Sequence, residues 1–375
     1  MRLWIVLLIG AAFYFLLNLI FRRNWYKGLD VGIDFEKKEV REGDRNTLIE
    51  VVRNDKAMPL PVALVKFSIT RTFLFPKETN SAVTDLYYRN EYFSLWSHQI
   101  ITRKYGFIAS KRGEYSITSL DLVCKDFFLF KNVFAGLKRF TSVLVLPGTI
   151  RPGDVPEDIM HLTGEIVHRN KLTEDPFAFR GVREYQPFDP VNHINWKATA
   201  KSDMLQVNTF HTTNRRNVTI LLNLETGSLR RGDVIAEAGI KIASYLTGYF
   251  IEEGIPVAVY TNGTDKDSEE LVYLEEGGDE EHLHNVDVAL ARLELKEFYP
   301  SFVQLMRERI GEGDKENDYV IISNDRREEL LEEYNALKSQ GAHLSFIIPD
   351  YEYVSVKHLT ADGNGIVKWG IDHEG

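Results

Sequence analysis

The stretch Val218-Thr219-Ile220-Leu221-Leu222 decides the fold of the carboxyl-terminal part of this chain. It is a short and nearly continuous apolar run, which is typical of a strand buried on both faces of a parallel sheet. A helical pattern follows from about Asp233 to Glu252, with apolar residues at helical spacing. A buried strand followed by such a helix is the repeating unit of α/β domains, so we expect a doubly wound sheet.

The same alternation continues toward the carboxyl end of the chain. Strand patterns occur at Ile255–Tyr260, Tyr319–Ile322 and Ala342–Ile348, and helical patterns at 284–311 and Arg326–Lys338. Strands that alternate with helices predict a parallel sheet covered on both faces. We therefore place an α/β domain at residues 213–375.

Residues 28–148 have a different pattern, that of a β-sandwich. Apolar and polar residues alternate with period two in Thr47–Val52 and Val62–Ile69, and turn residues such as Lys111-Arg112-Gly113 separate the runs. The last run, Ser142–Leu146, ends at a Pro-Gly pair. Short strands at near-regular spacing, without amphipathic helices between them, predict an immunoglobulin-like sandwich.

The amino-terminal segment, residues 1–27, has the character of a membrane anchor. Leu3–Phe21 is almost wholly apolar, close to the ~20 residues that a helix needs to cross the hydrocarbon core. A cleaved signal peptide is the alternative, but basic residues follow the apolar run in place of a small-x-small cleavage site. We expect an uncleaved, single-pass anchor in the cell membrane. Arg22, Arg23 and Lys27 favour a cytoplasmic location for the large domain.

Charge excludes one class of partner. The net charge is −10, and residues 1–27 hold four basic and no acidic residues, so the rest of the chain carries −14. A surface that acidic is unsuited to phosphate contacts, and we expect no nucleic-acid binding.

Catalytic motifs are missing from the sequence. It carries no Walker loop, no dinucleotide glycine fingerprint, no nucleophile elbow and no His-Glu-x-x-His motif. The single cysteine, Cys124, lies in a strand pattern and is expected to be a buried, inert thiol that forms no intrachain disulfide. We therefore expect neither enzymatic activity nor a bound cofactor.

Residues 149–212 connect the two domains and contain an unusual run, Arg183-Glu184-Tyr185-Gln186-Pro187-Phe188-Asp189-Pro190-Val191-Asn192-His193-Ile194-Asn195-Trp196-Lys197-Ala198-Thr199-Ala200-Lys201. One interpretation, which we favour, is a scaffold. Asp189 would close a turn through the backbone, and Trp196 with Ile194 would pack on the edge of the sheet.

The same run also supports a functional interpretation. Its basic residues would form a patch on an otherwise acidic protein, suited to the carboxylates or phosphates of a partner. The residues concerned are Arg180, Arg183, Lys197 and Lys201.

The run resembles the signature of the domain-of-unknown-function 58 family, approximately Arg-x-Tyr-x-Pro-Gly-Asp-x-x-x-x-Ile-x-Trp-Lys-x-x-Ala-Arg. Phe188 replaces the usual glycine and Lys201 the usual arginine. Two upstream segments, Arg112–Tyr115 and Asp126–Phe130, resemble further elements of that family. The residues in register with the signature are Arg183, Tyr185, Pro187, Asp189, Ile194, Trp196, Lys197 and Ala200.

This resemblance implies a bacterial membrane protein with a von Willebrand factor type A-like α/β domain. It further implies a non-catalytic adaptor or scaffold that docks a MoxR-type AAA+ ATPase, with other membrane proteins, in protein assembly, maturation or envelope processes. Many members have two membrane helices, whereas this chain shows one apolar run. The alternative we keep is an extracytoplasmic, metal-dependent binding module. Under the adaptor interpretation, Arg183, Lys197 and Lys201 are the candidate partner contacts.

A von Willebrand factor type A fold carries its metal-adhesion motif, Asp-x-Ser-x-Ser, after the first strand. The corresponding ligand positions here are Asn223, Glu225 and Gly227. Asparagine is neutral and glycine has no side chain, so this set is degenerate and we expect a structural loop without a metal. Asp325, after a later strand, is expected to cap the helix predicted to begin at Arg326.

Overall fold

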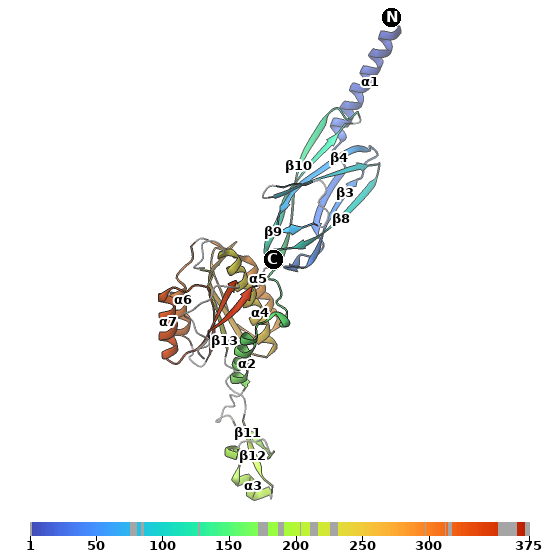
Figure 1. Cartoon of the computed structure of the whole chain (residues 1–375). Helices are drawn as coiled ribbons and strands as arrows, with labels where there is room; N and C mark the ends of the chain where they lie inside the picture. The colour runs from blue at the N-terminus through green and yellow to red at the C-terminus, as the bar shows by residue number, and fades with distance from the viewer. Residues whose placement is uncertain are drawn as a thin grey trace. The chain divides into compact units, whose positions relative to one another are not determined.

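The computed structural model divides the chain into two compact units, Met1–Gly148 and Thr149–Gly375 (Figure 1). Each unit has a hydrophobic core of its own. The structure describes residues 2–75, 81–83, 86–126, 128–171, 179–186, 191–202, 204–210, 217–225, 232–296, 298–311, 313, 317–351 and 366–371.

The first unit begins with helix α1 (Arg2–Asn24), whose Trp4–Asn24 portion is long and apolar enough to cross a membrane. Most of its side chains are exposed, but Phe21 and, just beyond its end, Trp25 are buried in the core of the sandwich.

Helix α4 (Gly232–Glu252) meets the same criteria of length and composition. More than half of that stretch is buried inside the second unit, as expected for a core helix.

The rest of the first unit is a sandwich of two sheets, which confirms the all-β prediction. Alternate residues of the strands point into a core shared by both sheets. One sheet has the order β1-β3-β8-β5 and the other β2-β10-β9-β4-β7-β6, with β2 parallel to β10 and the remaining pairs antiparallel. The strands are β1 (Leu29–Phe35), β2 (Glu39–Arg41), β3 (Arg45–Asn54), β4 (Leu60–Thr70), β5 (Phe73–Leu74), β6 (Ser81–Val83), β7 (Leu86–Leu95), β8 (Gln99–Ala109), β9 (Gly113–Lys125) and β10 (Asn132–Leu146).

A carboxyl group lies inside this sandwich. Glu50 on β3 is fully buried, and the hydroxyl of Tyr105 donates a hydrogen bond of 3.0 Å to its Oε2. Glu91 lies near enough to repel it and is itself paired with Arg103 at 3.1 Å. Burial, more than this repulsion, raises the pKa of Glu50 to about 7.

The second unit contains a seven-stranded sheet of order β15-β14-β13-β17-β18-β19, with β16 paired to β14. Strands β14, β13, β17, β18 and β19 are parallel, and β15 and β16 run antiparallel to β14. This confirms the predicted doubly wound sheet. The strands are β13 (Val218–Leu222), β14 (Val257–Asp265), β15 (Leu271–Gly277), β16 (Leu293–Glu294), β17 (Asp318–Ile322), β18 (His343–Tyr351) and β19 (Ile366–Ile371).

Helices cover both faces of this sheet, because its central strands are apolar on both sides. Ile220 of β13 packs with α4 and α5 (Glu280–Arg292), whereas Leu221 packs with α6 (Phe302–Met306), the π-helix Arg307–Gly311 and α7 (Glu328–Ser339). Figure 1 shows α4 and α5 on one side of the strands and α6 and α7 on the other.

The connecting region 149–212 differs from our expectation, because it holds a helix of the α/β core. After a 3-10 turn (Pro152–Asp154), α2 (Glu157–Lys171) buries Ile159, Leu162 and Ile166 against the sheet. Arg169 of α2 also pairs with Asp318 at 2.8 Å. Part of the predicted connection is therefore structurally part of the α/β unit.

The family-like run lies in a small separate element of the second unit. Antiparallel strands β11 (Phe179–Glu184) and β12 (Gln206–Phe210) enclose a 3-10 turn (Val191–His193) and the short helix α3 (Trp196–Ser202). We call residues 179–210 the signature module. Val207 is the one residue of this module that is buried among those whose burial the structure describes, so this part of the module has almost no core.

Candidate functional site

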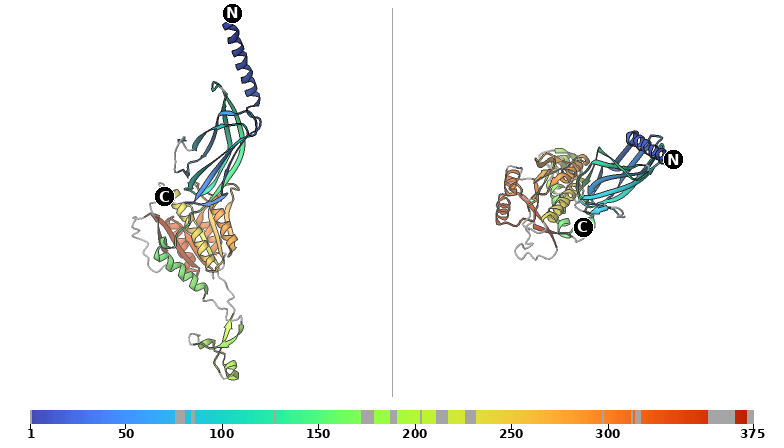
Figure 2. Two further views of the ribbon diagram at one scale, coloured as in Figure 1. Left: turned by 90° about the vertical axis from the view of Figure 1, so that its right-hand side faces the viewer. Right: turned by 90° about the horizontal axis from the view of Figure 1, so that it is seen from above.

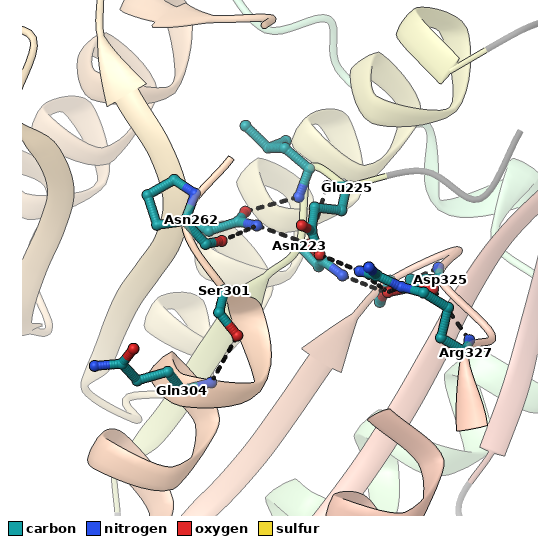
Figure 3. Close-up of polar contacts among 10 residues, drawn as sticks. Asn223, Glu225, Asn262, Ser301, Gln304, Asp325 and Arg327 are labelled. Carbon is teal, nitrogen blue, oxygen red and sulfur yellow. Dashed lines mark hydrogen bonds and ion pairs between the residues drawn. The ribbon is translucent and has the colours of Figure 1, made fainter. Parts of the chain in front are cut away.

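Strand β13 is followed along the chain by β14, which lies on one side of it in the sheet, whereas the later strand β17 lies on its other side. The connections after β13 and β17 therefore run to opposite sides, and the gap between these two strands is a topological switch point. In doubly wound sheets, ligands bind beyond the carboxyl ends of the strands at such a switch point. The loops after β13 and β17 meet here, and Figure 3 shows Asn223 and Glu225 of the first facing Asp325 and Arg327 of the second. We call this place the switch-point edge.

A buried amide network holds the first loop in place. Asn223 Oδ1 accepts hydrogen bonds from the backbone N–H of Glu225 and from Asn262 Nδ2, both at 2.9 Å. Asn223 Nδ2 donates to Ser323 Oγ at 2.9 Å, which joins the two loops. Asn262 Oδ1 accepts from the backbone N–H of Leu224 at 2.9 Å. Both lone pairs of the Asn223 oxygen are therefore used within the protein.

The cation at this edge is a guanidinium. Arg327 Nε donates to Asp325 Oδ2 at 2.8 Å, and its terminal nitrogen bridges Asp325 and Glu225. The Asp325 side chain is 3% exposed, so this buried carboxylate depends on the guanidinium to balance its charge. Hydrogen bonding to Asp325, together with the charges of Asp325 and Glu225, raises the pKa of Arg327 above its usual value.

The hydrogen bonds and ion pairs of this edge occupy the described residues at the degenerate metal positions. Asn223 is a structural amide, and the carboxylate of Glu225 is paired with Arg327. A divalent ion bound between the loops would have to displace that guanidinium. Gly227, the third position, lies outside the described residues. Among the described residues, no group of three or more His, Cys, Asp or Glu side chains is placed to hold a metal.

The expected role of Asp325 as a helix cap is wrong. Helix α7 begins at Glu328, and its N-cap residue is Arg327, which makes no side-chain cap. Asp325 instead accepts a hydrogen bond of 3.1 Å from the backbone N–H of Arg327 and binds the guanidinium of the same residue. The carboxylate therefore folds the Arg327 side chain back over the edge of the sheet.

A pocket of about 350 Å³ opens beside the guanidinium. Its described lining includes the carboxylates of Glu225, Asp233 and Asp325 and the cations of Lys296 and Arg327. Phe298, which is 86% exposed, lies at this pocket and offers an apolar surface to a partner. The pocket therefore combines charged groups of both signs with an exposed aromatic ring.

The signature module presents its aromatic residue outward. Trp196 at the start of α3 is 67% exposed. The expectation that it packs on the sheet edge is therefore wrong, whereas Ile194 does join the sheet through a bridge to Val207. The physical reason is size, because the part of the module whose burial the structure describes has one buried residue and no core that could take an indole ring.

Asn195 fixes the turn that leads into α3. Its Oδ1 accepts from the backbone N–H of Ala198 at 2.9 Å, which caps α3, and its Nδ2 donates to Asn208 at 2.7 Å. Pro187 and Asp189 lie outside the described residues, so their predicted roles stay predictions.

The remaining signature residues are distributed over both parts of the module. Lys197 and Lys201 are exposed and lie one turn apart on α3, hence on one face. Arg183 lies on β11, opposite Val207, and donates to the backbone carbonyl of Glu184 at 3.0 Å. Tyr185 is half-buried, and its backbone N–H bonds to Leu205. The side chain of Arg180 is outside the description.

Two residues of the switch-point edge were missed from the sequence. Arg327 has no distinctive spacing to Glu225, and only the meeting of β13 with β17 brings them together. Asn262 follows a buried run in β14, and a polar residue near the carboxyl end of a parallel strand is the one signal that could have marked it.

Neither a family model nor a curated protein matches this chain. Solved structures similar to it include the CARDB domain of a Pyrococcus furiosus protein, at 14% identity over 32% of this chain and 96% of that chain, with a TM-score of 0.21. A cohesin module from a Clostridium perfringens family 33 glycoside hydrolase is 12% identical over 31% of this chain and 96% of that chain, with a TM-score of 0.25. A non-cellulosomal cohesin from Archaeoglobus fulgidus is 9% identical over 35% and 96%, with a TM-score of 0.22. TM-scores this low support no statement about the function of this chain. Its fold is defined by the strand pairing described above.

Proposed function

We propose that this protein is a membrane-anchored, non-catalytic adaptor that docks a partner protein through the signature module. The observation that carries the proposal is Trp196, a large aromatic side chain held 67% exposed at the start of a capped helix. Exposed aromatic residues of this kind are enriched in protein interfaces, where they fill a pocket of the partner. The described residues of the module leave most of this side chain uncovered.

The surroundings of Trp196 fit an acidic partner surface. Lys197 and Lys201 follow it on α3, in a chain whose residues after the anchor carry a strongly negative charge. Local positive charge on an acidic protein orients an encounter and selects the partner's face. In line with the family resemblance, we assign the partner as a MoxR-type AAA+ ATPase, acting with other membrane proteins in assembly, maturation or envelope processes.

The α/β unit is proposed to be a von Willebrand factor type A-like domain that binds without a metal. Its support is the strand order about the switch point and the loops that meet there, with Arg327 between Glu225 and Asp325. The alternative, a metal-dependent module, would require an ion where this guanidinium lies. Binding at the switch-point edge would then involve its pocket and Phe298.

The anchor is proposed to be α1, uncleaved, with the two units on the cytoplasmic side. Its apolar composition and exposed surface support a spanning segment, and burial of Phe21 and Trp25 in the sandwich supports retention of the helix in the mature protein. Cleavage after the apolar run would remove part of a packed core.

Co-purification of the full chain from membranes with the ATPase tests the adaptor function. We expect Trp196→Ala to abolish co-purification, and Phe298→Ala to report whether the switch-point edge contributes. Phe140→Ala is the control, because Phe140 on β10 is a similarly exposed aromatic residue of the sandwich. Retained co-purification in both the Trp196 and Phe298 variants would refute docking through these surfaces.

A further inference from the structure

The β9–β10 hairpin of the sandwich carries an apolar tip that the described residues leave largely exposed. Phe128, Leu129 and Phe130 follow one another at this tip, and Phe130 is 78% exposed. We call these three residues the hairpin tip. Figures 1 and 2 show the hairpin extending alongside α1, and the rings of Tyr14 and Phe128 lie 4.9 Å apart.

The position of that contact along α1 sets the depth of the tip. If α1 spans from Leu3 to Phe21, Tyr14 lies about 10 Å inside the apolar segment from its Phe21 end. If the tip stayed in water, only Leu3–Phe13 would remain for the hydrocarbon. That stretch is about 16 Å long, roughly half of the ~30 Å core of a bilayer.

We infer that the hairpin tip inserts into the hydrocarbon of the membrane leaflet nearest the sandwich, beside α1. The inference rests on the proposed anchor, and it adds a second, non-helical membrane contact to it. The occupant of this apolar surface is lipid, because the surface continues directly from a helix whose own exposed face is lipid-like in composition.

Backbone N–H groups at the hairpin tip are hydrogen-bonded within the turn, which an apolar environment requires. An apolar medium penalises each unpaired N–H group, so a membrane-inserted turn must satisfy its own donors. The N–H groups of Phe130 and Lys131 both bond to Asp126 Oδ1, at 2.8 and 3.3 Å, and that of Leu129 bonds to the Asp126 carbonyl at 3.0 Å. Asp126 itself is buried, so its side chain does not form part of the tip's surface.

Charged residues limit how far the tip can insert. Lys125 and Lys131 are exposed on either side of the turn, and their ammonium groups must stay at the level of the lipid headgroups. Asp126 Oδ2 accepts no hydrogen bond from the described residues, which also favours a shallow depth. Of the described residues of the turn, the three of the hairpin tip then enter, as expected for an interfacial insertion of about 5–10 Å.

A tryptophan marks the membrane surface at the same end of the sandwich. Trp96 is exposed in the β7–β8 turn, and its carbonyl accepts from Asn54 Nδ2 at 2.8 Å. The neighbouring Lys56 bonds to the carbonyl of Trp25, at the end of α1. Trp96 therefore lies near the level at which α1 leaves the apolar region, where tryptophan is enriched in membrane proteins.

Site-directed spin labelling of the full chain in liposomes tests the inference. The native Cys124 is buried and burial raises its pKa to about 12, so it stays unlabelled in the folded protein. Nitroxide is attached to Phe130→Cys, to Leu8→Cys within α1, and to Ser110→Cys in the turn at the opposite end of the sandwich. Collisions with oxygen, which concentrates in lipid, and with a Ni(II) chelate, which stays in water, are then measured.

We expect the Phe130 and Leu8 labels to gain oxygen collisions and lose chelate collisions on reconstitution, with the Phe130 label about 5–10 Å below the phosphates. The Ser110 label should be unchanged. A water-exposed Phe130 label beside a lipid-exposed Leu8 label overturns the insertion and leaves the anchor intact. Loss of both kinds of collision at Phe130 indicates a protein contact and also overturns it. Water exposure at both positions overturns the anchor and the insertion together.

Discussion

Replacing Glu50 by glutamine should stabilise the sandwich at neutral and alkaline pH. Burial raises the pKa of this carboxyl to about 7 from an ordinary value of 4.5, so the folded state binds its proton more tightly than the unfolded state. Stability is then lost as the pH rises from about 4.5 to about 7. At 1.36 kcal/mol per unit of pKa, the full loss is about 3 kcal/mol. Glutamine keeps the shape of the protonated carboxyl and never ionises.

Hydrogen exchange of the full chain measures this effect locally, because the β3 and β8 amides report the opening of the sandwich. Compared at the same pH, Glu50→Gln and the wild type should differ by less than about 1 kcal/mol at pH 5 and by about 3 kcal/mol, roughly 100-fold in rate, at pH 8. Amides of β13 serve as an internal reference, since they belong to the other unit.

Glu36→Gln is the matched control, because Glu36 is exposed and only loosely paired with Lys104 at 3.8 Å. It should shift exchange by less than about 0.5 kcal/mol at either pH. A difference between Glu50→Gln and the wild type that does not change with pH would refute the reasoning, since it would mean that Glu50 is ionised in the folded sandwich over the whole range.

Three further outcomes follow from the second unit. Arg327→Ala should lower the free energy of unfolding by about 1–3 kcal/mol, because it leaves the buried Asp325 carboxylate unpaired. In thermal unfolding, millimolar Mg²⁺ should restore part of this loss. Stabilisation of the wild type by Mg²⁺ would contradict the assignment of Arg327 as the cation of the switch-point edge. Trp196→Ala should change the thermal stability by less than about 0.5 kcal/mol, and a larger loss would make Trp196 a scaffold residue. Gly263→Ala should cost about 1–3 kcal/mol in denaturant unfolding, because its Cβ would lie 2.5 Å from Leu224 Cδ1. Gly248→Ala, whose nearest neighbour would be at 3.8 Å, is the control and should be neutral or stabilising.

The strands of both units were predictable because their patterns are local. Val218–Leu222 is buried throughout, as its unbroken apolar run predicted, and the alternation of Thr47–Val52 appears as alternating burial in β3. Helix α2 was missed although Ile159, Leu162 and Ile166 have helical spacing. Its apolar stripe is narrow and the rest of its surface is polar, so only the sheet it packs against makes the pattern meaningful.

The candidate sites were less predictable, because they depend on which loops meet. Asn223 and Glu225 were identified as positions, but the cation between the loops comes from Arg327, on a strand-to-helix connection distant in the sequence. Trp196 was misplaced for another reason. We expected an aromatic residue to find a core, and the signature module is too small to provide one.

The burial of Phe21 and Trp25 has a mechanical consequence for an anchored protein. A flexible tether would let the sandwich tumble above the bilayer, whereas a helix whose end is part of the sandwich core forms one lever with it. If α1 is the anchor, as we propose, a sideways pull on the sandwich must tilt α1 within the lipid, and a change in the tilt of α1 must swing the sandwich. The angle between the first unit and the membrane plane is therefore a property of the fold.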